Sequence, residues 1–336
     1  MSATFTLVVI VVIVALLFDF VNGFHDAANA IATIVVSKTL TPLQAVLLAG
    51  VSNFIGYFVF GTAVAKMIGS GVVHIEQVTL PLLLATIAGA ILWNIMTWLL
   101  GLPTSSSHAL IGGLIGSGIA AAGAKVVIWG GVVKIFIFIF LAPILGFMAS
   151  VVFTTIIIWI FRKSTPSASS GVFKKLQLVS AVSVSIGHGT NDAQKTMGII
   201  ALALYTGHVS ASFQSGKIDE WVVFAAYTAI SLGTIFGGWR IVKTMGTSIT
   251  RIREMEGFCA NAAASIVLIG TAHAGIPVST THVIAGSIMG VGTVEHAKTV
   301  RWITARKIVW AWIVTIPTSA VFAAITYLTF SPLLPK

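Results

Sequence analysis

Long apolar stretches constrain this chain more than any other feature of its sequence. Leu80–Leu100, Ile135–Phe161 and Ile308–Phe330 carry no charged residue, and Phe5–Phe20 carries only one. A helix of about 20 apolar residues crosses the hydrocarbon core of a bilayer, so these stretches approach or exceed the necessary length. Hydrophobic residues make up 57% of the chain and charged residues 8%, against roughly 45–50% and about 25% in soluble domains. The sequence therefore predicts an all-α polytopic membrane protein.

The net charge of +10 would suit a nucleic-acid-binding protein, but the positions of the basic residues argue against that class. Twelve of the 19 Lys and Arg residues fall in three stretches, with four each in 162–175, 240–253 and 298–307. Basic clusters that flank membrane helices mark cytoplasmic loops. We therefore expect these stretches in the cytoplasm, the lipid bilayer as a partner and no nucleic acid. The single Cys259 excludes an intrachain disulfide and a cysteine-built metal site.

Two polar motifs each occur twice, in the same order, within otherwise apolar sequence. The acidic motif covers residues 22–29 (NGFHDAAN) and returns at residues 188–195 (HGTNDAQK). The hydroxyl motif covers residues 103–108 (PTSSSH) and returns at residues 277–282 (PVSTTH). Each half of the chain thus carries one copy of the pair. Because polar groups are costly inside a bilayer, a duplicated set of them indicates a functional site.

Equivalent loops of the two halves differ in charge. The basic stretches 240–253 and 298–307 have counterparts near 65–80 and 121–134, which hold only one and two basic residues. This asymmetry is expected when equivalent loops lie on opposite sides of the membrane, as in inverted-topology repeats. Both termini would then lie outside the cell. The expected division is a first inverted repeat at 1–161, a cytoplasmic linker at 162–177 and a second inverted repeat at 178–336.

About 10–12 membrane segments are expected, five or six in each half. The segments that follow Asp26, Pro103 and Pro277 are too short to cross a bilayer, which predicts discontinuous helices or re-entrant hairpins. Such backbone is tolerated at membrane depth only where protein or water satisfies its polar groups. The expected segments lie near 4–22, 26–37, 43–65, 80–100, 104–124, 126–161, 178–205, 221–239, 257–273, 278–294 and 306–330.

Each hydroxyl motif places a proline and several hydroxyl side chains at the start of an apolar helix. Proline fits the first turn of a helix, and Ser or Thr caps its free amides. A GxxxG pair follows at the same distance in both copies, Gly112 with Gly116 and Gly286 with Gly290, and permits close helix packing. Free amides at a positive helix end bind anions, and hydroxyls add donors without fixed charge. The candidate anion-binding residues are Thr104, Ser105, Ser106, Ser107, Ser279, Thr280 and Thr281.

The acidic motif has the chemistry of a cation or proton site. Asp26 and Asn29 stand three residues apart, which places both on one face of a helix or unwound turn. A carboxylate beside an amide oxygen suits a cation or a proton, and no fixed metal is expected. In the second copy Lys195 takes the place of Asn29, where it either neutralises Asp192 or contacts the anion. The coupling candidates are Asn22, Asp26, Asn29 and Asp192, and Asn191 and Lys195 join the anion-binding candidates.

Other polar residues in apolar segments are candidates for supporting roles. The four histidines near the motifs suit proton exchange or phosphate contact, although His108 and His282 are better placed to fix the hydroxyl loops. The asparagines either line the path or bridge helices. Asp19 has Ser185 at its equivalent position, and either joins the site or lies near a hydrated helix end. The supporting candidates are His25, His108, His188, His282, Asn94 and Asn261, with Asn53 a weaker candidate.

These motifs resemble those of the inorganic phosphate transporter (PiT) family. The resemblance rests on both acidic motifs, both hydroxyl motifs and Gly237–Arg240, so it covers nearly the whole chain. It implies a secondary transporter, not an enzyme, without a cofactor, that carries inorganic phosphate with a cation across the cytoplasmic membrane. It also implies that the substrate and ion site comprises Asp26, Asn29, Asp192 and the hydroxyl loops.

Lys195 departs from the pattern of the sodium-coupled members of that family, which resembles Asn-Asp-x-x-Asn in both halves. The Asp192 and Lys195 pair looks like the bacterial low-affinity branch, where a proton drives uptake and phosphate can travel as a metal–phosphate complex. We therefore expect proton symport. A sodium-coupled phosphate symporter and a sulfate permease of the same fold are the alternatives.

Two other classes fit less well. An anion channel would share inverted repeats and half-helices, but buried carboxylates would repel its permeant ion unless a cation or proton came too. An intramembrane serine hydrolase could use Ser107 and His108, but adjacent residues do not direct a serine Oγ toward the neighbouring imidazole. The expected class is therefore a carrier, with a homo-oligomer as an open alternative to a monomer.

Overall fold

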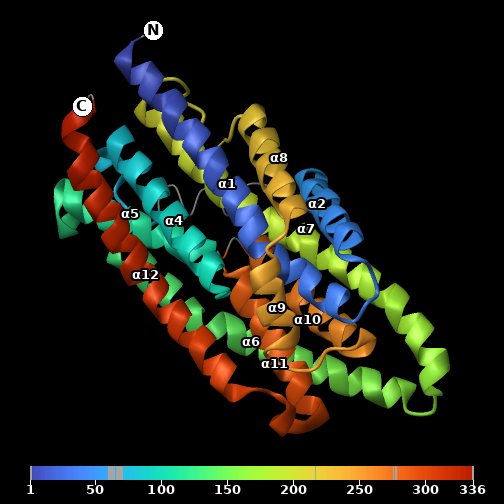
Figure 1. Ribbon diagram of the computed structural model, residues 1–336. Coiled ribbons are helices and arrows are strands. Elements are labelled where there is room, and N and C mark those ends of the chain that lie inside the picture. Colours follow the sequence, from blue (N-terminus) through green and yellow to red (C-terminus); the bar gives the residue numbers. More distant parts are fainter. Residues whose placement is uncertain are drawn as a thin grey trace.

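The computed structural model describes residues 2–59, 65, 71–215, 217–274, 276 and 278–334, except the side chains of 59, 166–168 and 296. These residues form eleven α-helices in an elongated bundle whose two chain ends lie together (Figure 1). The helices are α1 (Ala3–Val36), α2 (Pro42–Val59), α4 (Leu80–Leu100), α5 (Ser106–Ala122), α6 (Trp129–Phe161), α7 (Pro166–Thr206), α8 (Glu220–Phe236), α9 (Trp239–Thr247), α10 (Glu254–His273), α11 (Thr280–His296) and α12 (Trp302–Phe330).

Many of these helices suit a membrane. Within the described ranges α1, α4, α6, α10 and the segment that contains α12 are long and apolar enough to cross one, and α8 with α9 forms a further candidate span bent by 71°. Gly237, at the break, has a φ of 71°, a backbone conformation that favours glycine. The prediction of an all-α, multi-pass membrane protein is confirmed.

Short helices follow both hydroxyl motifs, as expected. Helices α5 and α11 have 17 residues each. The Ser105 hydroxyl accepts a hydrogen bond from the His108 amide at 3.3 Å, and the Ser279 hydroxyl accepts one from the His282 amide at 3.2 Å. Both serines are therefore N-caps, which satisfy amides that a helix leaves free at its start. Pro277 lies outside the described residues.

The GxxxG glycines bring each short helix against a long one. A Cβ on Gly116 of α5 would lie 2.0 Å from the Ala320 carbonyl oxygen of α12. A Cβ on Gly286 of α11 would lie 2.2 Å from the Pro143 carbonyl oxygen of α6. Neither distance leaves room for a side chain. The helix pairs α5–α12 and α11–α6 are therefore built in the same way.

The acidic motifs lie inside long, unbroken helices, which corrects one expectation. A short separate segment was expected after Asp26, but α1 continues through it from Ala3 to Val36. Helix α7 likewise passes through Asp192 and has 41 residues. The backbone of both helices stays helical through the motifs, and the motif side chains find partners both within their own helix and on neighbouring helices. The expected linker at 162–177 is also helical from Pro166 onward.

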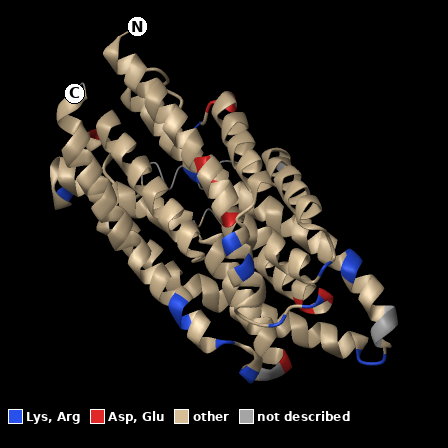
Figure 2. Ribbon diagram, viewed as in Figure 1, with Lys and Arg blue, Asp and Glu red and all other residues tan. Residues whose placement is uncertain are grey.

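Charged residues are distributed unevenly along the bundle. Figure 2 shows most Lys and Arg residues toward the end that lies opposite the two chain ends. That end includes the turn between α6 and α7 and the start of α12. In the middle of α1, by contrast, Figure 2 shows acidic residues. The basic stretches expected to share one aqueous side thus lie toward one end of the molecule.

Candidate functional site

Each acidic motif contacts the hydroxyl loop of the opposite half. On α1, the Asn29 amide donates to the Thr281 hydroxyl at 2.9 Å and to the Thr280 hydroxyl at 3.3 Å. On α7, the Lys195 ammonium donates to the hydroxyl of Ser107, in the first turn of α5. In the two repeated motifs, Lys195 corresponds to Asn29 and Ser107 to Thr281. The structure therefore brings both copies of both motifs into one site.

Asp192 is held by three side chains. Its Oδ1 accepts a hydrogen bond from Lys195, and its Oδ2 lies 3.2 Å from Nε2 of His188 and 3.5 Å from the Thr280 hydroxyl. Asp192 and Lys195 are both buried. Removing an ion from water costs several kcal/mol, so a buried pair needs partners of this kind. Lys195 thus neutralises Asp192 and also reaches the hydroxyl loop.

Asp26 is paired in a different way. Its Oδ1 lies 2.6 Å from Nδ1 of His25, and the opposite ring nitrogen lies 3.0 Å from the Thr97 hydroxyl. Thr104, in the first hydroxyl loop, donates to the same Thr97 hydroxyl at 3.0 Å. Within the described part of the chain, no lysine or arginine forms an ion pair with Asp26. A histidine therefore contacts the motif carboxylate in the first half, whereas a lysine does so in the second.

The two motif carboxylates meet near an imidazole. One oxygen of Asp26, one oxygen of Asp192 and one ring nitrogen of His188 all lie within 4.8 Å of one another. All three side chains are buried. Carboxylates at this separation repel each other unless positive charge lies between them. The cluster therefore suits a site where a cation or a proton accompanies an anion.

Several site groups are buried without a hydrogen-bond partner in the described structure. They include the Ser106 hydroxyl and the side-chain carbonyls of Asn29 and Asn191. Buried polar groups usually bind a ligand or water when no protein partner is present. Ser106 is therefore suited to contact an anion directly. The Asn191 amide group is engaged elsewhere, because it donates to the carbonyl oxygens of Gly187 at 2.9 Å and Leu268 at 3.4 Å.

The two loop histidines pack together behind the hydroxyls. The ring centroids of His108 and His282 lie 4.8 Å apart, and His282 stacks on Trp312 at 4.0 Å. Nδ1 of His282 also lies 3.2 Å from the carbonyl oxygen of Ile139. The Trp312 indole donates to the carbonyl oxygen of Pro103 at 2.9 Å. These contacts link both loops and favour the supporting role expected for the two histidines.

The asparagines differ in what they contact. The Asn261 carbonyl accepts a hydrogen bond from Thr33 at 3.1 Å and so bridges α10 and α1, whereas the Asn94 amide has no partner among the described residues. Asn53 contacts the site more closely than its sequence suggested. Its oxygen lies 3.4 Å from Nδ1 of His188, and its nitrogen donates to Thr234 at 2.8 Å.

Thr97, a threonine of the site, was not predicted from the sequence. Thr97 contacts both His25 and Thr104, yet its hydroxyl also donates to the carbonyl oxygen of Trp93, four residues earlier. A threonine that bonds to its own helix is common in membrane helices, so the sequence carries no distinguishing signal. Only the spatial partners of Thr97 identify it as part of the site.

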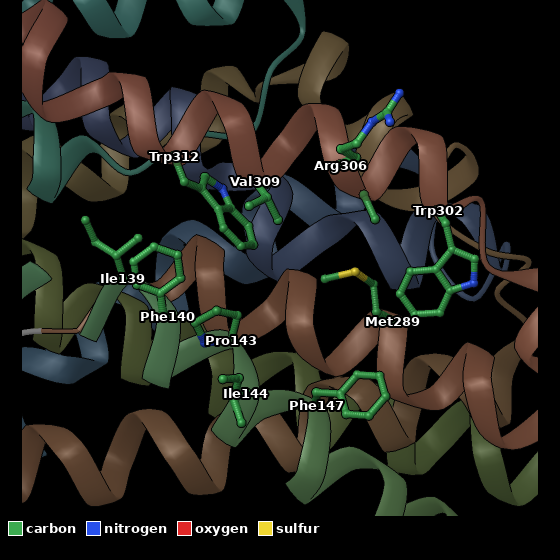
Figure 3. Close-up of a pocket in the computed structure, with 11 residues that line it drawn as sticks. Ile139, Phe140, Pro143, Ile144, Phe147, Met289, Trp302, Arg306, Val309 and Trp312 are labelled. Carbon is green, nitrogen blue, oxygen red and sulfur yellow. The ribbon is translucent and has the colours of Figure 1, made fainter. Parts of the chain in front are cut away.

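An apolar pocket lies beside the polar site, between α6, α11 and α12 (Figure 3). Its volume is about 470 Å³, and its lining includes Ile139, Phe140, Phe147 and Met289. The guanidinium of Arg306 points away from these side chains (Figure 3). The surface of this pocket is almost entirely apolar, and the Trp312 indole N–H already donates to Pro103, so the pocket offers little to an anion. The buried polar cluster is therefore the better candidate for the substrate site.

Comparisons with known proteins identify phosphate transporters as similar to this chain. The sequence pattern of the phosphate transporter family matches residues 22–323. A probable low-affinity inorganic phosphate transporter of Rhizobium meliloti is 47% identical over 97% of this chain and 98% of its own length. A Bacillus subtilis protein with the same description is 44% identical over 97% of this chain and 98% of its own length. A solved structure described as the sodium-dependent phosphate transporter has a TM-score of 0.90 and 25% identity, and the match covers 98% of this chain and 100% of that one.

Proposed function

This chain belongs to the phosphate transporter family, and we propose that it imports inorganic phosphate across the cytoplasmic membrane together with a proton. Its family and named relatives are transporters, so it is a transporter and not an enzyme. The observation that carries the proposal is the contact of Lys195 with both Asp192 and Ser107. This one ammonium joins the candidate ion site to the candidate anion site.

Phosphate would bind between the two hydroxyl loops. Helices α5 and α11 begin there, and the positive ends of both helices favour an anion. The unpartnered Ser106 hydroxyl supplies a free donor, and the Lys195 ammonium supplies a positive charge. We assign phosphate contact to these two residues and to Thr280 and Thr281. Asp26, Asn29 and Asp192 form the adjoining ion site.

Lys195 supports proton coupling over sodium coupling. In the first half, the Asn29 amide leaves Asp26 free of a lysine partner, whereas in the second half an ammonium already neutralises Asp192. A fixed ammonium takes the place of a mobile cation beside that carboxylate. Sodium coupling, as named for the solved relative, is the alternative.

Phosphate is the expected substrate in preference to sulfate. Hydrogen phosphate carries a proton that a buried carboxylate can accept, whereas sulfate near neutral pH carries none. An unpaired buried acceptor costs about 1–3 kcal/mol, or roughly five- to a hundredfold in affinity. Competition for phosphate uptake measures this preference. Equal inhibition by unlabelled sulfate and phosphate would contradict it.

The two halves would operate as inverted repeats with both termini outside the cell. The like packing of α5 on α12 and α11 on α6 supports this arrangement, as does the concentration of basic residues at one end. Single cysteines at Ser2 and Ser164, both exposed, test it in a Cys259→Ala background. Labelling of the two positions from opposite sides is expected. Labelling of both from one side would exclude this topology.

The coupling ion is tested by phosphate uptake into proteoliposomes. An inward pH gradient and an inward sodium gradient are imposed separately, with choline replacing sodium in the first case. We expect accumulation with the pH gradient alone and none with the sodium gradient alone. Sodium-driven accumulation without a pH gradient would show that the chain is a sodium symporter.

A further inference from the structure

Asp19 is a buried carboxylate that neither repeated motif contains. It lies seven residues before Asp26 on α1, which is about two helical turns and therefore on nearly the same face. Its side chain is fully buried, and neither carboxylate oxygen makes a hydrogen bond of ordinary length to the described residues. An unpaired polar group in such a place calls for a ligand or a functional role.

The groups around Asp19 also lack partners. Its polar neighbours are Asn22 on α1 and Thr196 on α7, and Tyr227 of α8 faces it. The Asn22 carbonyl, the Thr196 hydroxyl and the Tyr227 hydroxyl are all buried and make no hydrogen bond of ordinary length in the described structure. The first two are the nearest polar groups to the Asp19 carboxyl, and Tyr227 acts on it from a third helix.

Asp19 differs from both motif aspartates in its charge environment. Asp26 lies against His25, and Asp192 lies against Lys195 and His188. No basic side chain forms an ion pair with Asp19 in the described ranges. The charged groups that face it from α7 are Asp192 and, more weakly, Lys195. A buried carboxylate without a counter-charge is strongly disfavoured, which suits Asp19 to hold a proton.

We propose that Asp19 carries the transported proton, and that it does so in place of the two motif aspartates. This inference rests on the proposed proton-coupled import of phosphate. Asp19 lies toward the chain ends from Asp26, so it stands between that face of the membrane and the phosphate site. The Thr196 hydroxyl can donate to the ionised carboxylate or accept from the protonated acid, and the Asn22 side chain offers an amide donor and a carbonyl acceptor.

Electrostatics couples the proton on Asp19 to phosphate binding. The negative charge of Asp192 opposes ionisation of Asp19, and a phosphate anion near Lys195 would oppose it further. Phosphate therefore favours the protonated form of Asp19. By linkage, the protonated form favours phosphate binding to the same extent. A second mobile cation is less favoured here, because the Lys195 ammonium already acts on this region.

The test separates exchange from accumulation in reconstituted vesicles. Exchange of labelled for unlabelled phosphate at equal concentrations and equal pH needs no net proton movement, whereas accumulation against a phosphate gradient does. We compare Asp19→Asn, which removes the proton site at nearly constant shape, with Asp19→Glu, which retains a carboxyl. Ser185→Ala is the matched control, because Ser185 occupies the equivalent position on α7 and donates to the Ala181 carbonyl oxygen.

We expect Asp19→Asn to exchange phosphate at the wild-type rate and to lose accumulation driven by a pH gradient. Asp19→Glu is expected to retain accumulation with a shifted pH profile, and Ser185→Ala to behave as the wild type. Unchanged pH-driven accumulation by Asp19→Asn would overturn the inference. Loss of both exchange and accumulation in Asp19→Asn would also overturn it, because coupling would not have been separated from transport. Failure of wild-type protein to respond to the pH gradient would refute the proposed function instead.

Discussion

The two halves of this molecule stabilise equivalent carboxylates with different partners. In the first half, Asp26 lies against the His25 imidazole, and Asn29 contacts the hydroxyl loop through its neutral amide. In the second half, Lys195 serves both purposes, because its ammonium contacts Asp192 and the Ser107 hydroxyl together. The helix packing is alike in the two halves, whereas the charge is not. A duplicated framework can therefore hold a lysine–carboxylate ion pair in one half and none in the other.

Removal of a motif carboxylate should lower the stability of the protein more in the second half than in the first. Asp192→Asn leaves the Lys195 ammonium buried without its counter-charge, a change that costs about 3–5 kcal/mol. Asp26→Asn removes an acceptor from the His25 imidazole and leaves no lysine or arginine partner of Asp26 unpaired in the described residues, at about 1–3 kcal/mol. We expect the first variant to unfold at a clearly lower temperature in detergent, although both should lose phosphate accumulation.

The control for this comparison is the double variant Asp192→Asn with Lys195→Asn. It removes both charges and should recover much of the stability lost in Asp192→Asn alone. Equal destabilisation by the two single aspartate variants would show that the halves do not differ in charge as described.

Lys195→Asn converts the second half to the pattern of the first. We expect the free energy of unfolding to fall by about 3 kcal/mol. This is the lower end for a broken buried ion pair, because His188 and Thr280 still contact Asp192. Phosphate uptake should fall, and sodium should restore part of it by replacing the missing positive charge. Uptake by the variant is measured with sodium or choline outside. An uptake rate that sodium does not change would argue that Lys195 does not occupy a cation's place.

Loss of one loop hydroxyl should sharpen the same comparison. Ser107→Ala removes the hydroxyl that accepts a hydrogen bond from the charged Lys195 ammonium. Such a bond is worth about 1.5–3 kcal/mol, so the phosphate concentration at half-maximal uptake should rise roughly ten- to a hundredfold. Thr281→Ala removes the hydroxyl that accepts a hydrogen bond from the neutral Asn29 amide. That bond is worth about 0.5–1.5 kcal/mol, so the same phosphate concentration should rise only roughly two- to tenfold. Initial uptake rates over a range of phosphate concentrations report both values. A larger effect of Thr281→Ala would reverse the comparison.

The sequence predicted the parts of the fold that depend on local signals. The starts of α5 and α11 follow from a capping serine and a later GxxxG pair, which act over a few residues. The continuity of α1 through Asp26 was not predicted. Asn29 finds its partner in Thr281, 252 positions away, and no local pattern shows that such a partner exists.

The candidate site was predicted in composition but not in pairing. Both motifs and their repetition identified the residues that meet in the structure. That each acidic motif contacts the loop of the opposite half depends on how the helices pack, which the sequence does not state. The absence of a basic partner at Asp19 was not predictable either, because it depends on which side chains of the neighbouring helices lie near that carboxyl. Such facts appear only when the partners are placed in space.

The central claim is that Lys195 takes the place of a mobile cation beside Asp192. Phosphate binding to the purified transporter tests it most directly, measured by calorimetry at constant pH with sodium or choline as the only monovalent cation. We expect the same phosphate dissociation constant in both salts for the wild type, and tighter binding in sodium for Lys195→Asn. Phosphate binding to the wild type that tightens markedly when sodium replaces choline would contradict the claim.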